Sequence, residues 1–496
     1  MTVSTDEALA KSDAFPLSEK NISAQVRAAQ YAVRGEIVIR AGELEEELKK
    51  GKKLPYGDSI LYCNIGNPQQ LGQVPITFFR QVLALCDYPE MMANPHADKI
   101  FPKDVLKRAK EYLAAIPGGT GAYTSSQGAP ICREHVAAGI THRDHGIKSD
   151  PGNIFMSDGA SQSVHTILRM LLRGTQDAVL TPIPQYPLYS AALALYNGTL
   201  LPYYLDEQNQ WALRLDECKS QVDKARSEGQ NVRALIVINP GNPTGSVLSE
   251  ENQKEIVKFC VRESLVLLAD EVYQDNIYIA GKTFHSFKRV AVELGKEAEQ
   301  LVLVSMHSIS KGFYGECGRR GGYMEIINLP ADVKAQLIKL SSINLCSNVN
   351  GQICTAMMMN PPKEGEESYE LFAKERQGLL DSLKRRAKLL VTALNKLEGV
   401  TCNEAEGALY AMPQLKLPAG AAKAAEESGK PVDFFYCKAL LESTGIVTVP
   451  GSGFKQAENT YHFRTTILPP EDQIEEVTER LSKFHAEFMK KYSNSS

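Results

Sequence analysis

The stretch Leu235-Ile-Val-Ile-Asn-Pro-Gly-Asn-Pro-Thr-Gly245 joins a short β-prone run to a turn dense in Pro and Gly. Comparable runs rich in Val, Leu and Ile lie at residues 179–183, 265–269 and 301–305, each bounded by Pro, Gly or polar residues. Short apolar runs of this kind are typical of strands buried on both faces. The stretch therefore predicts one inner strand of a largely parallel sheet.

Amphipathic segments lie between these runs. Residues 161–173 carry apolar side chains at helical spacing and stop at Gly174, and residues 250–263 follow the potential cap Ser249. Strand and helix patterns that alternate in this way indicate an α/β fold. Ligands of such folds lie beyond the carboxyl ends of the strands, so we expect the functional residues in loops that follow strands.

The chain of 496 residues is too long for one compact core, since domains usually hold about 100–200 residues. We expect an N-terminal helical segment at 1–95, a large domain at 96–355 and a smaller α+β domain at 356–496. The N-terminal segment is predicted to hold one or two exposed helices at 24–50. The last part is predicted to hold a long helix at 371–397, strands near 408–412, 446–449 and 461–468, and a closing helix at 472–491. Residues 418–431 are predicted to form a surface excursion.

Composition excludes several classes of protein. The net charge is -4 and Lys and Arg are scattered, which argues against nucleic acid as the main partner. No apolar run approaches the roughly 20 residues of a membrane span. The N-terminus resembles neither a secretory signal nor a transit peptide, so we expect the cytoplasm, with a mitochondrial location open if a presequence has been removed. The ten cysteines are dispersed without a C-x-x-C pair, so we expect no metal site.

Two ionisable residues follow predicted strands. Lys311 stands in Ser308-Ile-Ser-Lys-Gly, and a deprotonated lysine amine can form an imine with an aldehyde. The alternative is a solvated surface lysine. Asp270 closes the run 265–269, where a carboxylate is poorly solvated unless it meets a partner such as a protonated ring nitrogen. The alternative is an acidic helix cap.

Three polar or aromatic residues fit the rest of an aromatic ligand. Tyr273 and Asn242 can each hydrogen-bond a ring hydroxyl oxygen, although Asn242 also suits a plain turn. Tyr186, in a Pro-rich turn, can lie flat on a ring or pack in the core.

Anions have two candidate sites. Ala160 and Ser161 begin a helix whose backbone N–H groups can approach a phosphate, and Arg320 or its neighbour Arg319 can supply a cation to the same group. Arg464 lies in a β-prone run, where an arginine needs a carboxylate partner. For Arg464 that partner is either a ligand or a structural salt bridge.

Together these residues resemble the class I/II aminotransferases. The resemblance is carried, in this order, by the blocks Asn-Pro-Thr-Gly (242–245), Asp-Glu-Val-Tyr (270–273) and Ser-x-Ser-Lys (308–311), followed by Arg464. These aminotransferases are pyridoxal-phosphate enzymes of fold type I. The resemblance covers about residues 26–488. Blocks at 32–35, 75–86, 180–191, 311–323 and 449–454 are similar to the alanine-specific branch. The resemblance implies a large cofactor-binding domain, a small domain that includes N-terminal residues, and a homodimer to whose contacts the N-terminal segment contributes.

The resemblance also implies a role for each candidate around the cofactor ring. Lys311 would bind pyridoxal 5'-phosphate as a Schiff base and shuttle the proton, and Asp270 would pair with the pyridine nitrogen. Tyr273 and Asn242 would hold the ring oxygen, and Tyr186 would stack on the ring.

Further residues are implied at the phosphate and at the substrate. The phosphate residues implied are Ala160, Ser161, Ser308 and Arg320. Many relatives place this arginine eight residues after the lysine, at Arg319, whereas the alanine-specific loop is one residue longer and favours Arg320. The substrate residues implied are Gly66, Asn242 and Arg464. Tyr123 resembles the tyrosine that reaches the phosphate from the partner subunit.

The function implied is reversible transfer of an amino group from L-alanine to 2-oxoglutarate, giving pyruvate and L-glutamate by a ping-pong mechanism. The alternative within the family is a glutamate:glyoxylate aminotransferase. A decarboxylase, a carbon–carbon synthase and a non-catalytic binding protein are further alternatives. Non-enzymes on this scaffold usually lose the lysine or the aspartate, and both are present here.

Overall fold

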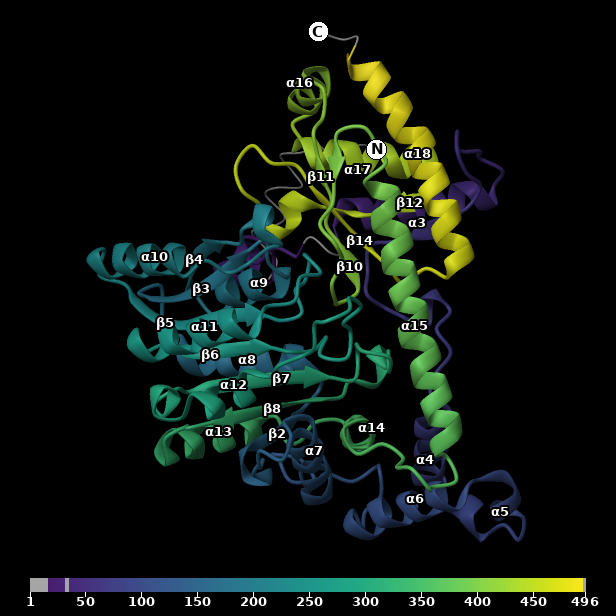
Figure 1. The fold of residues 1–496 in the computed structure, drawn as a ribbon, viewed down its shortest axis with the longest axis vertical. Helices are drawn as coiled ribbons and strands as arrows, with labels where there is room; N and C mark the ends of the chain where they lie inside the picture. Colours follow the sequence, from purple (N-terminus) through teal and green to yellow (C-terminus); the bar gives the residue numbers. More distant parts are fainter. Residues whose placement is uncertain (1–16, 32–34, 494–496) are drawn as a thin grey trace.

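A computed structural model describes residues 17–31 and 35–493 of the chain. Its centre is a seven-stranded sheet in the order β2-β8-β7-β6-β5-β3-β4 (Figure 1). The strands are β2 (Ile154–Ser157), β3 (Asp177–Ile183), β4 (Thr199–Tyr204), β5 (Asn231–Ile238), β6 (Val266–Asp270), β7 (Leu303–Ser308) and β8 (Gly322–Ile327). In this sheet β8 is antiparallel to both neighbours and the remaining pairs are parallel. The α/β prediction is confirmed.

Helices cover both faces of this sheet. One face packs against α10 (Leu215–Ser227), α11 (Glu250–Arg262) and α12 (Phe287–Leu294). The other packs against α8 (Ala160–Leu171), α9 (Pro187–Leu195) and α13 (Ala331–Ile343). Along β6, Leu267 and Ala269 join the first core and Leu268 joins the second. The inner strands are therefore buried on both faces, as their apolar runs predict, and successive residues point to opposite layers.

Two strands of this sheet were not predicted. Strand β4 contains Pro202 and lies at the edge of the sheet, where a missing backbone N–H is tolerated. Strand β8 contains Glu325, whose Oε1 accepts hydrogen bonds from Lys288 Nζ at 2.7 Å and from Ser149 Oγ at 2.5 Å. Both partners are remote in sequence, so the pattern around Glu325 did not indicate a buried strand.

A third core packs beyond β2. It is built from α4 (Thr77–Asp87), α6 (Lys103–Ala115), α7 (Pro130–Arg143) and α14 (Val349–Met359), with the short α5 (Ala97–Ile100) beside them. The long helix α15 (Tyr369–Leu394) runs from this region past the sheet to the C-terminal part (Figure 1).

The C-terminal part is a smaller α+β unit. Its helices are α16 (Ala419–Glu427), α17 (Val432–Thr444) and α18 (Glu471–Ser493), and its strands are β9 (Val400–Thr401), β10 (Tyr410–Ala411), β11 (Gln414–Leu415), β12 (Ile446–Val447), β13 (Val449–Pro450) and β14 (Phe463–Thr466). Strand β1 (Leu61–Tyr62) pairs in parallel with β12, so N-terminal residues join this unit. The division at 95 and 355 stays a prediction.

Two local predictions need correction. Helices form within 24–50 as predicted, but α3 (Glu36–Lys49) is not exposed on all sides, because Ile37, Ala41 and Leu44 are buried against the C-terminal core. Residues 418–431 are not a surface excursion, because α16 buries Ala421 and Ala425 and packs against α17 and α18.

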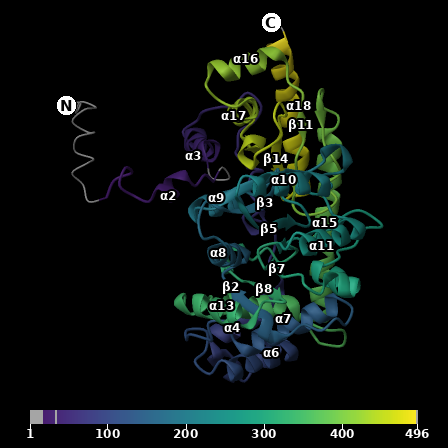
Figure 2. The ribbon, with the colours of Figure 1, turned by 90° about the vertical axis from the view of Figure 1, so that its left-hand side faces the viewer.

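The N-terminal arm reaches out from the body of the chain, and its helix α2 (Ala24–Ala28) contacts α9 (Figure 2). Among the described residues, no helix is long and apolar enough to cross a membrane.

Candidate active site

The carboxyl ends of β5, β6 and β7 open into one pocket of about 530 Å³, within the usual range for small-molecule sites. Lys311 lies in this pocket, in the loop three residues beyond the end of β7. Its Nζ donates a hydrogen bond to the Gly66 carbonyl at 2.9 Å. The alternative of a solvated surface lysine is therefore wrong, and the amine lies beside a residue that arrives from the N-terminal part of the chain.

Asp270 is the last residue of β6 and is only 6% exposed. Tyr189 donates its phenol proton to Oδ2 at 2.7 Å, and the backbone N–H of Val272 lies 3.4 Å from Oδ1. Burial raises the pKa of this carboxyl, although Tyr189, Val272 and the charge of Lys311 oppose the rise. No helix begins at Asp270, so the helix-cap alternative is wrong. A buried carboxylate of this kind favours a cationic partner in the pocket.

A chain of polar contacts links Tyr273, Asn242 and Arg464. The Asn242 side-chain amide lies 3.3 Å from the Tyr273 hydroxyl, and Arg464 NH1 donates to the Asn242 side-chain oxygen at 3.0 Å. The Arg464 guanidinium lies 4.1 Å from the ring centre of Tyr410 and 4.7 Å from that of Phe454. Two rings and the hydrogen bond to Asn242 therefore hold the plane of the guanidinium in place.

Arg464 is 1% exposed and also donates through NH2 to the Asn64 carbonyl. Within the described part of the chain it has no carboxylate in ion-pair contact, and its buried Nε has no hydrogen-bond partner. The structural salt bridge is therefore wrong as an explanation of this arginine. A buried cation without a protein counter-ion is the arrangement expected of an anion-binding site.

The start of α8 forms the other end of the pocket. Gly159 precedes the helix at φ 82° without a side-chain cap, and Arg320 NH2 donates to the Asp158 carbonyl at 2.8 Å and to Ser161 Oγ at 3.4 Å. The positive φ of Gly159 favours glycine, and a Cβ there would stand 2.5 Å from that NH2, so the guanidinium would have to move. Free helix N–H groups and an arginine thus converge on one point.

Arg319 turns away from that point. Its Nε lies 3.3 Å from Glu316 Oε2, whereas Arg320 lines the pocket. Arg320 adopts the left-handed backbone region at φ 49°, which separates the directions of the two neighbouring side chains.

Most of the predicted site residues share this pocket. Those that line it are Gly66, Ala160, Ser161, Tyr186, Asn242, Asp270, Tyr273, Ser308, Lys311, Arg320 and Arg464. Tyr123 does not line it within one chain; its side chain is 78% exposed on the surface.

Tyr410 is a pocket residue that the sequence reasoning missed. Its hydroxyl lies close to Gly66 and on the same side as the Lys311 amine, because a Cβ at Gly66 would meet both Tyr410 Oη and Lys311 Nζ. Burial alone would raise the pKa of Tyr410, but the charges of Lys311 and Arg464 and a hydrogen bond with Tyr273 lower it below its usual value. Residues 408–412 were predicted as a strand only, and no local sequence pattern indicates that the Tyr410 hydroxyl faces a polar pocket.

Tyr31 and Cys317 were also missed. The Tyr31 hydroxyl lies 2.8 Å from that of Tyr186, so the N-terminal arm reaches the rim of the pocket. Cys317 lines the pocket and its thiol lies 3.1 Å from the Ser310 carbonyl. Cys317 belongs to the block 311–323 that resembles the family, so its closeness to Lys311 in the sequence could have marked it as a pocket residue.

Known proteins share this sequence and fold. The family described as aminotransferase class I and II matches residues 93–481. Alanine aminotransferase 1, mitochondrial, of Arabidopsis thaliana is 55% identical over 97% of this chain and 89% of its own length. Glutamate–glyoxylate aminotransferase 1 of the same plant is 50% identical over 96% and 98%. The solved alanine aminotransferase of Pyrococcus furiosus, 24% identical, covers 94% of this chain and 100% of its own at a TM-score of 0.74 and shows the shared fold. The chain therefore belongs to the class I and II aminotransferases, which are pyridoxal-phosphate-dependent transaminases.

Proposed function

We propose that this enzyme transfers an amino group reversibly between L-alanine and 2-oxoglutarate. The observation that carries the proposal is one pocket that holds an amine (Lys311), a buried carboxylate (Asp270) and a buried guanidinium (Arg464) with no carboxylate partner among the described residues. The choice of alanine rests on the Arabidopsis relative at 55% identity, compared with 50% for the glutamate–glyoxylate enzyme. Glutamate and glyoxylate are the second candidate pair.

The residues present fit pyridoxal 5'-phosphate at both ends of the pocket. The uncapped start of α8 with Arg320 suits its dianionic phosphate, and the buried carboxylate of Asp270 suits its protonated ring nitrogen. Bound there, the cofactor supplies an electron sink for the substrate carbon. We assign Ser161, Ser308 and the backbone at Ala160 to the phosphate with Arg320, in preference to Arg319.

The remaining residues hold the ring and the reacting groups. We assign Tyr273 and Asn242 to the ring oxygen and Tyr186 to the ring face. Lys311 Nζ would hold the cofactor through its aldehyde group and would move the α-proton of the substrate. Its hydrogen bond to the Gly66 carbonyl fixes the amine inside the pocket.

Arg464 receives the substrate carboxylate. Because its guanidinium is clamped between Tyr410 and Phe454, it binds the carboxylate in one orientation and so directs the Cα–H bond. Asn242 and the backbone at Gly66 lie beside it and complete this subsite. The same arginine serves alanine and 2-oxoglutarate in turn, which a ping-pong mechanism requires.

The test is Lys311→Ala. We expect loss of pyruvate formation from alanine and 2-oxoglutarate and loss of the visible band of lysine-bound cofactor. Lys334→Ala, whose Nζ contacts Asn153 at 2.8 Å outside the pocket, is the matched control and should keep both. Turnover that persists in Lys311→Ala would falsify the proposal. A comparison of kcat/KM for alanine with 2-oxoglutarate and for glutamate with glyoxylate decides between the two substrate pairs.

We also infer a homodimer in which Tyr123 of one subunit reaches the phosphate of the other. Tyr123, Ile343 and Leu345 are 78%, 68% and 53% exposed, and the Ser126 and Ser342 hydroxyls, 3.0 Å apart, bring these segments to one face. Exposed apolar side chains gathered on one face support a contact with another protein surface. Sedimentation should give a dimer, and Ile343→Lys should shift it toward monomer and weaken cofactor binding. The cytoplasm stays our prediction for the compartment, with the mitochondrion open.

A further inference from the structure

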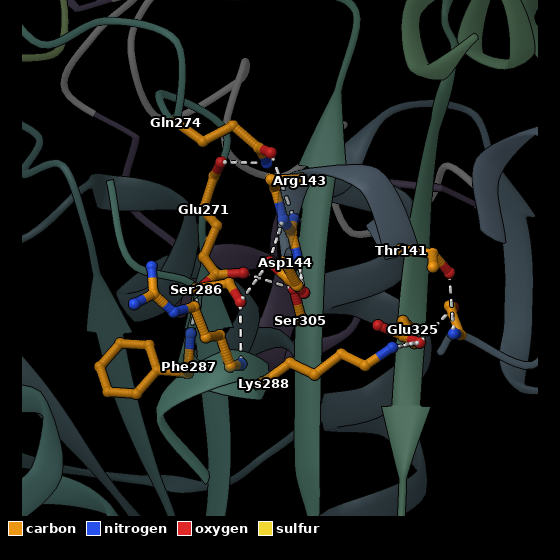
Figure 3. Close-up of polar contacts among 12 residues, drawn as sticks. Thr141, Arg143, Asp144, Glu271, Gln274, Ser286, Phe287, Lys288, Ser305 and Glu325 are labelled. Carbon is orange, nitrogen blue, oxygen red and sulfur yellow. Dashed lines mark hydrogen bonds and ion pairs between the residues drawn. The ribbon is translucent and has the colours of Figure 1, made fainter. Parts of the chain in front are cut away.

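A second polar site lies behind the strand end that carries Asp270. Successive strand residues point to opposite faces, so Asp270 faces the α8 and α9 layer with the pocket and Glu271 faces the α12 layer. Glu271 is fully buried. Both of its oxygens accept hydrogen bonds, from Ser305 Oγ at 2.5 Å and from the backbone N–H of Phe287 at 2.8 Å (Figure 3).

These contacts continue as a closed ring. Gln274 donates to the Glu271 backbone carbonyl at 3.1 Å, and Arg143 NH1 donates to the Gln274 side-chain oxygen at 3.2 Å. Arg143 also donates to both oxygens of Asp144 at 2.8 Å, and Asp144 accepts from Ser286 Oγ at 2.9 Å. Ser286 precedes Phe287 and caps α12, which returns the path to Glu271. We call this set the rear ring: Arg143, Asp144, Glu271, Gln274, Ser286, Phe287 and Ser305 (Figure 3).

We call residues 270–273 the catalytic turn, because they run from Asp270 to Tyr273. The rear ring contacts this turn at both ends. Glu271 directly follows Asp270, and Gln274 directly follows Tyr273. Through the ring this turn is tied to the end of α7, the start of α12 and the middle of β7. Since β7 leads to Lys311, the ring connects the two strands that present the proposed acid–base groups.

Stability alone does not account for this ring. Apolar residues of similar volume usually stabilise a core at least as well as buried charges do. Burial raises the pKa of Glu271 to about 7, against the opposing effects of Arg143, Ser305 and Phe287. What a hydrogen-bonded ring adds over apolar packing is a defined geometry, because each bond prescribes distance and direction.

We propose that Glu271 is a positioning residue, which through the rear ring holds Asp270 and Tyr273 in register with Lys311. The inference rests on the proposed function, since it assigns Glu271 to the placement of groups that act there. A displacement of about 1 Å in such groups can lower a rate about a hundredfold.

Glu325 offers a matched control. It is a second buried carboxylate, 2% exposed, on the neighbouring strand β8, and it binds Lys288 (Figure 3). It also accepts a hydrogen bond from Ser149. Neither of these partners belongs to the rear ring. Replacing Glu325 therefore removes a comparable buried interaction without touching the catalytic turn.

The experiment compares Glu271→Ala, Glu271→Gln and Glu325→Ala as loaded enzymes. We expect Glu271→Ala to lower kcat about a hundredfold with the KM for alanine within about threefold. Its apo-protein should bind pyridoxal phosphate at least about tenfold more weakly, because the contact of Asp270 is misplaced. Glu271→Gln should recover to within about tenfold of wild-type kcat, since its amide can accept from Phe287 and donate to Ser305. Glu325→Ala should lose as much thermal stability yet keep kcat and cofactor affinity within about twofold.

Equal losses of kcat and of cofactor affinity in Glu271→Ala and Glu325→Ala overturn the positioning role. If Glu271→Ala does not fold, Ser305→Ala replaces it because it removes one of the two hydrogen bonds to Glu271, and wild-type kcat and cofactor affinity in that variant overturn the role as well. The two proposals fail separately. If the wild-type enzyme has no transaminase activity, the proposed function is refuted. If cofactor affinity nevertheless falls in the Glu271 variants and not in Glu325→Ala, the positioning role stands.

Discussion

Arg464→Lys tests the substrate subsite most directly. Arginine presents five donors in a rigid fork, whereas lysine presents one compact ammonium on a flexible stem. In the structure Arg464 donates through NH1 to Asn242 and through NH2 to Asn64, and its Nε finds no partner in residues 17–31 and 35–493. A lysine at this position cannot satisfy both protein oxygens and also present two donors to a carboxylate.

The expected magnitude follows from the hydrogen bonds that are lost. One hydrogen bond to a charged group contributes about 1.5–3 kcal/mol, and each 1.4 kcal/mol is about tenfold in an equilibrium constant. The KM for alanine should therefore rise about ten- to hundredfold. Because 2-oxoglutarate uses the same arginine, its KM should rise by a similar factor. If the lost contact is equal in the ground and transition states, kcat stays within about fivefold.

The assay is steady-state pyruvate formation with each substrate varied in turn. Arg480→Lys is the control, because Arg480 is also buried, at 7% exposure, and donates to the Thr444 and Ser59 carbonyls away from the pocket. It should lower the unfolding midpoint without changing either KM. If both KM values of folded Arg464→Lys stay within about twofold of wild type, Arg464 does not bind the carboxylate.

Three further outcomes are expected. Asp270→Asn should still bind cofactor but lose about 10²–10³ in kcat, because a neutral amide does not hold the ring nitrogen protonated; near-normal kcat contradicts this role. Tyr410→Phe should lower kcat about tenfold and shift its pH profile, since the hydroxyl beside Lys311 shares a proton network with Tyr273; an unchanged pH profile removes Tyr410 from that network. The pKa of Glu271 is about 7 in the folded chain against an ordinary 4.5, so the folded state retains its proton between these values. Stability of wild type relative to Glu271→Gln should therefore fall as pH rises from 4.5 to 7, by about 1–3 kcal/mol in urea unfolding; a rise with pH contradicts the assignment.

Local patterns predicted the inner strands well, because a strand buried on both faces must be apolar along its whole length. The runs at 235–238 and 265–269 lie within or overlap β5 and β6. The cap at Ser249 is also local, and its hydroxyl accepts from the Asn252 N–H as expected. Strands β4 and β8 were not predicted because each contains a residue that local patterns count against a strand. Pro202 is tolerated because β4 lies at the edge of the sheet, and Glu325 because side chains distant in sequence bind its carboxylate.

The site shows the same difference between features set by local sequence and features set by distant contacts. The sequence alone determined the residue types at the strand ends, since Lys311, Asp270 and Asn242 are marked by the runs that precede them. Only the tertiary structure placed Tyr410 against Lys311, turned Arg319 to Glu316, and closed the rear ring behind Asp270. These features depend on contacts between segments far apart in the chain and on which face of a backbone each side chain leaves. Local sequence patterns record neither, because they report propensity and burial but not the partner that satisfies a buried polar group.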